Sequence, residues 1–442
     1  MRIKLSDHFT LKRLLKFVFP SIIMMIIISI YGVIDGFFVS NYVGKSAFSS
    51  LNLVMPFIMI LGGMGFMIGT GGSALVSKTL GQKENEKANK IFSMMIVFTT
   101  ILGLILSIIG IIFIRPVSYL LGASDEMIDN CVLYGRIVTS FTALFMLQNV
   151  FQSFLATAEK PKIGLIVTIA AGTTNAVLDY LFVAVFNFGL AGAAVATGIG
   201  QVVGGLIPLI YFILPNDSLL KLVKTKLSIK ELLAACANGS SELMSNVSSS
   251  IVGMVYNLQL MKYIGEDGVA TYGVLMYVQF VFVAIFIGYS IGTAPIVGYN
   301  YGAANYDELK NVRKKSIAIM FTTGITLSII AQLLAGTLAK IFVGYDQNLY
   351  VLTVHAFRIF SFAFILTGFN IFSSSFFTAL NNGAISALIA FLRTLVFQLG
   401  SVLMLPLIIS VDGIWFAICV AEVFATAISL FFMITKQKVY HY

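Results

Sequence analysis

The sequence is poor in charged residues, cysteine, histidine and tryptophan. Only 11% of its 442 residues are Asp, Glu, Lys or Arg, and 58% are hydrophobic. Soluble globular domains have about 25% charged residues, so this composition excludes an ordinary soluble protein. The three cysteines have no disulfide or metal-ligand spacing, and the three histidines are scattered. Nothing supports a nucleophile–base pair or a metal centre, so we expect neither an enzyme nor a cofactor.

Long apolar segments make up most of the chain. Each is long enough to cross the hydrocarbon core of a bilayer, which takes about 20 helical residues. None alternates with the period of two that a membrane-spanning strand requires. The sequence therefore predicts an all-α polytopic membrane protein with twelve transmembrane helices. The predicted segments are 14–40, 49–77, 90–114, 128–157, 163–186, 190–214, 230–260, 269–298, 312–338, 350–380, 384–408 and 413–434.

Basic residues are distributed unevenly between the loops. A net charge of +9 is compatible with nucleic-acid binding, but most lysines and arginines lie in alternate loops, as on the cytoplasmic side of membrane proteins. We therefore expect a lipid bilayer and no nucleic acid as partner, with both termini inside. The first apolar segment is too long for a signal-peptide core, so we interpret it as a retained span.

The two halves of the chain resemble each other. The motif at Tyr42–Gly44 matches the one at Tyr263–Gly265, and Gly81 matches Gly302 at the same spacing. Because each half has six segments, the repeat is parallel, with a pseudo-two-fold axis along the membrane normal and a cavity between two lobes. The predicted domains are a first lobe at 1–214, a cytoplasmic linker at 215–229 and a second lobe at 230–442.

Two acidic residues lie inside apolar segments of the first half. A charge at the centre of a membrane costs at least ~2.5 kcal/mol, so Asp35 and Asp179 favour ion-coupled transport. Asn175 precedes Asp179 by one helical turn and shares its face. These oxygens suit a hard cation, and desolvated carboxylates also exchange protons, so both Na⁺ and H⁺ remain open. The alternative is a buried polar network. Pro20 permits either a static bend or a hinge.

The second half contributes candidates of two kinds. Glu242 lies among serines and could be functional or structural, whereas Glu422, as a lone acid, favours a structural role. Aromatic, amide and thioether side chains in the seventh and eighth segments suit flat cationic compounds, although such residues also pack cores or face lipid. The predicted substrate cavity consists of Glu242, Tyr256, Asn257, Met276, Gln279 and Phe280.

Several motifs together resemble those of one transporter family. They are Pro20 with Asp35 in YGVIDGFFVSNYVG (Tyr31–Gly44), IGTGGSALVSKTLGQ (Ile68–Gln82), NAVLDY (Asn175–Tyr180), GLAGAAVATGIGQ (Gly189–Gln201) and GSSELMSN (Gly239–Asn246). The chain resembles the multidrug and toxic compound extrusion (MATE) family over essentially its whole length. It is most similar to the bacterial branch with MepA and DinF-like proteins.

The resemblance implies a function and a site. It implies a MATE/MOP-type antiporter of the bacterial plasma membrane, active as a monomer, that exports amphipathic organic cations in exchange for H⁺ or Na⁺. The implied cation site consists of Asp35, Asn175, Asp179 and Thr197. A second family site has an acid in the tenth segment, where this chain has Asn370, and this favours coupling in the first lobe. The alternative is a flippase for lipid-linked oligosaccharide or peptidoglycan precursors, which would require intramembrane cationic residues.

Overall fold

The protein is built from helices. The computed structural model describes residues 3–442, and these residues contain no strand. The helices of the first half are α1 (Leu11–Phe38), η1 (Val39–Val43), α2 (Lys45–Gly81), α3 (Asn85–Leu120), α4 (Ile128–Ser140), α5 (Thr142–Thr157), α6 (Pro161–Asp179), η2 (Tyr180–Val185) and α7 (Gly189–Ile213). Those of the second half are α8 (Ile229–Tyr263), α9 (Glu266–Gly302), α10 (Tyr306–Val343), α11 (Gln347–Phe360), η3 (Ser361–Ala363), α12 (Phe364–Ala379), α13 (Gly383–Phe391), η4 (Leu392–Gln398), α14 (Leu399–Met404), α15 (Pro406–Thr435) and α16 (Gln437–Tyr440).

All twelve predicted segments are helical, although they differ in detail from the prediction. Within the described chain, ten helices are long and apolar enough to cross a membrane. The pair α4 and α5, bent by 55°, adds an eleventh. The 35-residue α8 is the remaining segment, and its serines, Glu242 and Asn246 make it less apolar. The predicted end of the eleventh segment at 408 is wrong, because α14 already ends at Met404.

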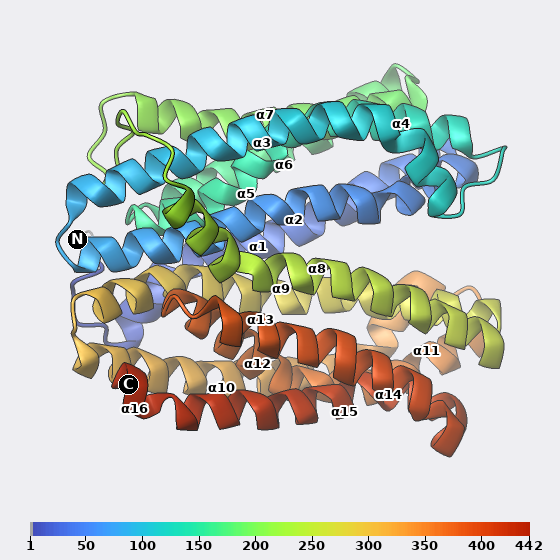
Figure 1. Cartoon of the computed structure of the whole chain (residues 1–442). Coiled ribbons are helices and arrows are strands. Elements are labelled where there is room, and N and C mark those ends of the chain that lie inside the picture. The colour runs from blue at the N-terminus through green and yellow to red at the C-terminus, as the bar shows by residue number, and fades with distance from the viewer. Residues whose placement is uncertain (1–2) are drawn as a thin grey trace.

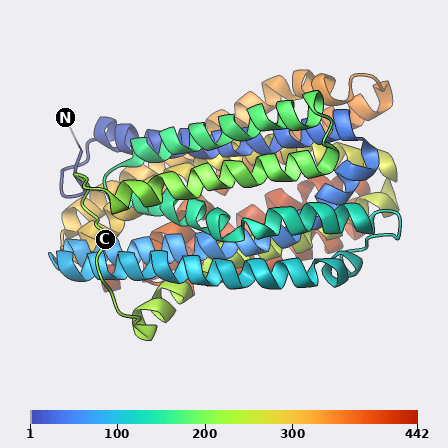
Figure 2. The ribbon, with the colours of Figure 1, turned by 90° about the horizontal axis from the view of Figure 1, so that it is seen from above.

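The helices form two bundles that lie side by side (Figure 1). We call α1–α7 the first bundle and α8–α16 the second bundle. Both termini lie at the same end of the molecule, on the left of Figure 1, as an even number of crossings requires. The view from above shows the long helices running nearly parallel from this end to the other (Figure 2). We call the end with the termini the terminal end, and the opposite end the distal end.

The bundles touch most closely at the terminal end. A Cβ atom on Gly71 of α2 would lie 1.9 Å from the carbonyl oxygen of Ala235 in α8. One on Gly302 of α9 would lie 2.0 Å from the carbonyl oxygen of Lys78 in α2. At the distal end of α8 and α9, Cβ atoms on Gly253 and Gly273 would meet nothing within 4 Å. The bundles therefore close at the terminal end and separate toward the distal end.

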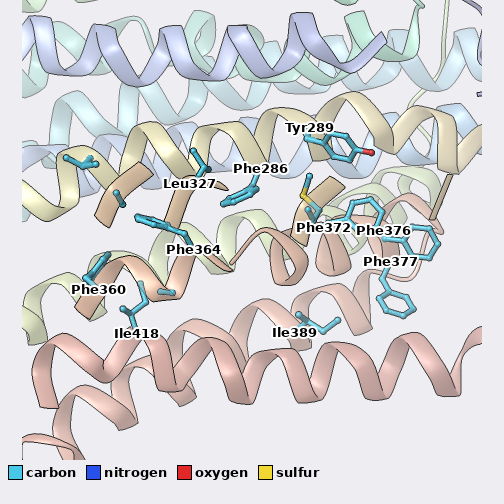
Figure 3. Packing of buried hydrophobic residues seen from close by; sticks show 14 of the residues in the cluster. Phe286, Tyr289, Leu327, Phe360, Phe364, Phe372, Phe376, Phe377, Ile389 and Ile418 are labelled. Carbon is cyan, nitrogen blue, oxygen red and sulfur yellow. The ribbon is translucent and has the colours of Figure 1, made fainter. Parts of the chain in front are cut away.

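The second bundle is held together by a core of aromatic side chains (Figure 3). Phe286, Phe360 and Phe364 are at most 2% exposed and belong to one apolar cluster. The start of the chain joins this cluster through Phe9, which is fully buried. The backbone N–H of Phe9 donates to Glu308 of α10 at 2.9 Å. The segment before α1 is therefore attached to the second bundle although it leads into the first.

Candidate functional site

Asp35 and Thr197 meet inside the first bundle. Asp35 lies near the distal end of α1 and is only 6% exposed. The Thr197 hydroxyl on α7 donates to Asp35 Oδ1 at 3.5 Å, the outer limit of a hydrogen bond. Among the described residues, no basic side chain forms an ion pair with Asp35. A carboxylate with one weak polar partner is therefore buried at this point.

Asp179 lies close enough to Asp35 for the two carboxylates to repel each other when both are charged. Asp179 is fully buried at the end of α6, and its carboxylate interacts with the side chain of Asn175, one turn earlier. Within residues 3–442, neither its oxygens nor the Asn175 amide nitrogen makes a hydrogen bond of good geometry. Buried polar groups are rarely left unpaired in proteins. The two Asp179 oxygens close to Asp35 are therefore a candidate site for a proton or cation.

The local backbone around both acids departs from a regular α-helix. α1 passes into the π-helix η1 shortly after Asp35, and α6 passes into η2 directly after Asp179. Short π-helical segments within α-helices occur often at functional sites. Gly200 brings α7 close to α6, because a Cβ atom there would lie 3.1 Å from Asn175 Cβ. The sequence thus places the four predicted residues on three helices that converge.

Tyr134 is a member of this cluster that the sequence did not reveal. It lies on α4, is fully buried, and its hydroxyl is near Thr197 and within electrostatic range of both Asp35 and Asp179. In the sequence, Tyr134 is one of 18 tyrosines and has no fixed spacing from the two acids. Only the packing of α4 against α7 brings it to the site. Its hydroxyl is a further oxygen for a bound cation or a donor to a carboxylate.

The site supplies oxygen atoms only. Two carboxylates, the Asn175 amide oxygen and the hydroxyls of Thr197 and Tyr134 suit a hard cation, which prefers oxygen ligands. Two carboxylates in a low-dielectric interior also share protons, because both cannot remain charged side by side without cost. The described chain contains no cluster of three or more His, Cys, Asp or Glu that could hold a metal ion. The oxygen atoms of this arrangement can bind and release H⁺ or a hard cation.

Pro20 lies at the contact between the bundles. α1 continues through Pro20 without interruption. On either side of it, Val18 and Ile22 face Gly292 and Gly288 of α9, where added Cβ atoms would lie 3.0 Å and 2.6 Å from their Cα atoms. A change of direction at Pro20 would therefore alter how α1 meets the second bundle. The hinge itself stays a prediction.

The predicted cavity residues do not form one surface. Tyr256 is fully buried and stacks on Tyr272, with ring centroids 4.7 Å apart, so it does not line a cavity here. Asn257 and Phe280 are exposed, whereas Met276 and Gln279 are half-buried. Glu242 is half-buried, and no described residue forms an ion pair or hydrogen bond with its carboxylate. Glu242 is the one acidic residue among the six candidates.

Glu422 belongs to a buried network that the sequence did not predict. Arg393 on η4 donates through Nε and Nη2 to Glu422 Oε1 at 2.9 and 2.6 Å. Asn370 on α12 donates to Glu422 Oε2 at 2.6 Å. Glu422 is 2% exposed. The charge of Glu422 is therefore neutralised by the Arg393 guanidinium, whereas Asp35 and Asp179 have no such basic partner among the described residues.

Comparisons with known proteins agree with this architecture. A protein-family model described as MatE matches the chain twice, at residues 20–181 and 243–403, and covers more than half of it. The chain belongs to the MatE family. The predicted resemblance and the all-α fold are thereby confirmed, and membership of this family of multi-pass membrane transporters is consistent with a protein that is not an enzyme.

Individual MatE proteins are similar over nearly the full length. A relative named multidrug export protein MepA, from Staphylococcus haemolyticus (strain JCSC1435), is 25% identical over 435 residues, covering 97% of this chain and 94% of the relative. The crystal structure of a MATE protein in complex with MaL6 has a TM-score of 0.93 at 22% identity and 98% coverage of both chains. A structure described as the outward-facing conformation of a multidrug resistance MATE family transporter has a TM-score of 0.92 at 21% identity, covering 98% of this chain and 97% of that one.

In this MatE chain, we expect the Arg393–Glu422 pair to stabilise the second bundle. Arg393→Met or Glu422→Gln alone leaves a buried partner uncompensated, which typically costs about 3–5 kcal/mol, whereas replacing both by apolar residues costs less. Thermal unfolding in detergent checks this through the fluorescence of Trp415, the only tryptophan, which is fully buried in the same bundle. Arg358→Met, which alters an exposed arginine on α11, is the matched control. Equal melting temperatures for it and the single variants would contradict the prediction.

Proposed function

We propose that the protein is an antiporter that exports amphipathic organic cations in exchange for H⁺ or Na⁺. The observation that carries this proposal is the pair of buried carboxylates, Asp35 and Asp179, without ion-pair partners among the described residues. Such a pair is costly in a membrane interior, and its cost falls when it binds a cation or proton. Asn175, Thr197 and Tyr134 supply the remaining oxygens.

Alternating access is the second part of the proposal. With both termini in the cytoplasm of a bacterium, the terminal end faces inward, and the contacts of Gly71 and Gly302 close the inner side. The structure then corresponds to an outward-facing state. A bound ion changes this equilibrium only if its affinity differs between the two states. Helix α1 connects ion binding with the change between the two states, since it carries both Asp35 and Pro20.

The proposed substrate class rests on the acid Glu242 and on exposed aromatic side chains of the second bundle. Glu242 is a partly exposed carboxylate without a basic partner among the described residues, and Phe280 on α9 is 67% exposed. Acidic and aromatic side chains both attract flat organic cations, the acid through its charge and the ring through its π-face. The curated relatives carry the name multidrug export protein. Export of varied amphipathic cations is therefore the activity we propose.

A flippase for pyrophosphate-linked lipids is the weaker candidate. Its cavity would require free cationic side chains to bind two phosphates. Arg393, the basic residue in the middle of a predicted span, is instead paired with Glu422, and Arg136 and Arg358 are exposed near the distal ends of their predicted spans. The paired Arg393, together with Glu242, which has no basic partner among the described residues, thus favours cations over phosphates.

Transport in proteoliposomes tests the proposed function. We expect ethidium to leave vesicles containing the purified protein when an inward H⁺ or Na⁺ gradient is imposed, and to stay when none is. Glu242→Gln is expected to raise the KM for ethidium severalfold while the dependence on the ion gradient persists. Glu266→Gln, in the first turn of α9, is the matched control. If neither gradient drives efflux from folded protein, the antiport proposal is wrong.

A further inference from the structure

The connection between the bundles is fixed to the surface of α3. The backbone N–H of Lys221 donates to the Asn89 side chain at 3.0 Å, and that of Val223 donates to the Ser93 hydroxyl at 2.9 Å. The Thr225 hydroxyl donates to the carbonyl oxygen of Lys90 at 3.0 Å. Three hydrogen bonds to acceptors within residues 89–93 of α3 hold this extended segment, 214–228, in a defined place.

The segment lies at the depth where lipid headgroups meet hydrocarbon. α3 carries no charged residue between Lys90 and Arg115, and at about 1.5 Å per residue this stretch matches the hydrocarbon core of a bilayer. Ser93, the partner of Val223, lies less than one turn inside that boundary. The segment therefore runs along the membrane surface rather than through the aqueous phase.

A groove of about 480 Å³ opens between this segment, α3 and the end of α7. Its lining is mostly apolar and includes Ile96, Val97 and Ile101 of α3, with Leu209 of α7. Val97 and Ile101 are 51% and 53% exposed, so the groove faces the lipid and not the other bundle. Its apolar lining suits an acyl chain that lies along α3.

Basic residues gather where the headgroup of such a lipid would lie. Lys224 lines the groove, and Lys221, Lys226 and Lys230 are exposed nearby. Acidic residues of this region only partly offset the four lysines, because Asp217 is paired with Lys160 and only Glu231 and Glu86 remain nearby. Each lysine near an anionic membrane surface adds to the attraction between the protein and anionic headgroups. Exposed Leu227 and Ile229, at 65% and 64%, add apolar contacts with the membrane.

We propose that this groove binds a phospholipid with an anionic headgroup. One acyl chain lies along Ile96, Val97 and Ile101, and Lys224 and Lys226 contact the phosphate. The site connects the two bundles, because its linker side leads directly into α8. It is independent of the proposed transport activity, since it rests on the groove, its depth and its charge.

Photo-crosslinking tests the site directly. The protein is placed in nanodiscs of phosphatidylcholine that contain a trace of phosphatidylglycerol with a photoactivatable acyl chain, and the labelled peptides are identified by mass spectrometry. We expect labelling of α3 around Val97–Ile101 that falls severalfold in Lys224→Gln/Lys226→Gln. Lys436→Gln/Lys438→Gln, which removes two lysines at the terminal end of the second bundle, is expected to leave it unchanged. Val97→Trp, which fills the groove, is expected to reduce it as well.

Competition experiments and a second lipid probe distinguish binding of an anionic lipid from binding of other anions and from nonspecific contact. Unlabelled phosphatidylglycerol should compete for the site, whereas inorganic phosphate should not. Equal labelling by a photoactivatable phosphatidylcholine would show that the headgroup is not recognised and would overturn the proposal. Protection by inorganic phosphate would assign the lysines to a free anion and would overturn it too, as would an unchanged signal in the Lys224→Gln/Lys226→Gln variant.

Discussion

Asp35→Asn is expected to reduce gradient-driven efflux of ethidium to the level of protein-free vesicles. The substitution keeps the size of the side chain and removes the charge that binds the coupling ion, while Thr197 can still hydrogen-bond to the amide. Burial of a neutral amide costs less than burial of an unpaired carboxylate, so the variant should fold at least as stably as the parent. Efflux from proteoliposomes and thermal unfolding of the same preparation check both parts.

A matched control separates coupling from a general effect of charge. Glu126→Gln removes one exposed acid from the turn between α3 and α4 and should transport at the parent rate. Asp179→Asn should behave like Asp35→Asn, because the two carboxylates act on the same ion. Normal gradient-driven efflux by either aspartate variant would remove that residue from the coupling site.

Alanine at the closest contacts between the bundles is expected to open the terminal end. In Gly71→Ala/Gly302→Ala, each new Cβ atom would meet a carbonyl oxygen at 1.9 or 2.0 Å, where real contacts exceed 3.0 Å. Such overpacking costs about 1–3 kcal/mol per position, and about 1.4 kcal/mol corresponds to a tenfold change in an equilibrium constant. The population of the conformation with a closed terminal end should therefore fall at least tenfold.

Distances between spin labels at Lys162 and Lys314 measure this shift. Both side chains are exposed near the terminal end, one on each bundle, and the three native cysteines are replaced first. We expect a longer distance in the glycine variant and a slower transport rate. Gly253→Ala/Gly273→Ala adds the same two methyl groups to α8 and α9 where nothing lies within 4 Å. Identical distance distributions for the two pairs would show that the glycines do not hold the terminal end closed.

The helical segments could be predicted because membrane insertion acts on local composition. Long apolar runs and the bias of basic residues are properties of single segments, and they were sufficient to locate all twelve helical segments. The breaks inside segments were not predictable in this way. The 55° bend at Phe141 and the π-helices after Asp35 and Asp179 depend on the neighbours against which those helices pack.

The candidate site was predictable in part for the same reason. Asn175 and Asp179 share a helix face by their spacing, and the family motif adds Asp35 and Thr197. Tyr134 and the Arg393–Glu422 pair come from helices whose relative positions the sequence does not reveal. Tyr256 illustrates the converse, since an amphipathic residue typical of a cavity is instead stacked inside the second bundle.

Simultaneous recording of ion and drug movement tests the central claim most directly. Ethidium efflux and the internal concentration of H⁺ or Na⁺ would be followed together in proteoliposomes, with the parent protein and Asp179→Asn. Coupling at the buried carboxylates predicts that one of the two ions enters as ethidium leaves, and that both fluxes disappear in the variant. Ethidium efflux with no movement of either ion, or equal coupled fluxes in the variant, would contradict it.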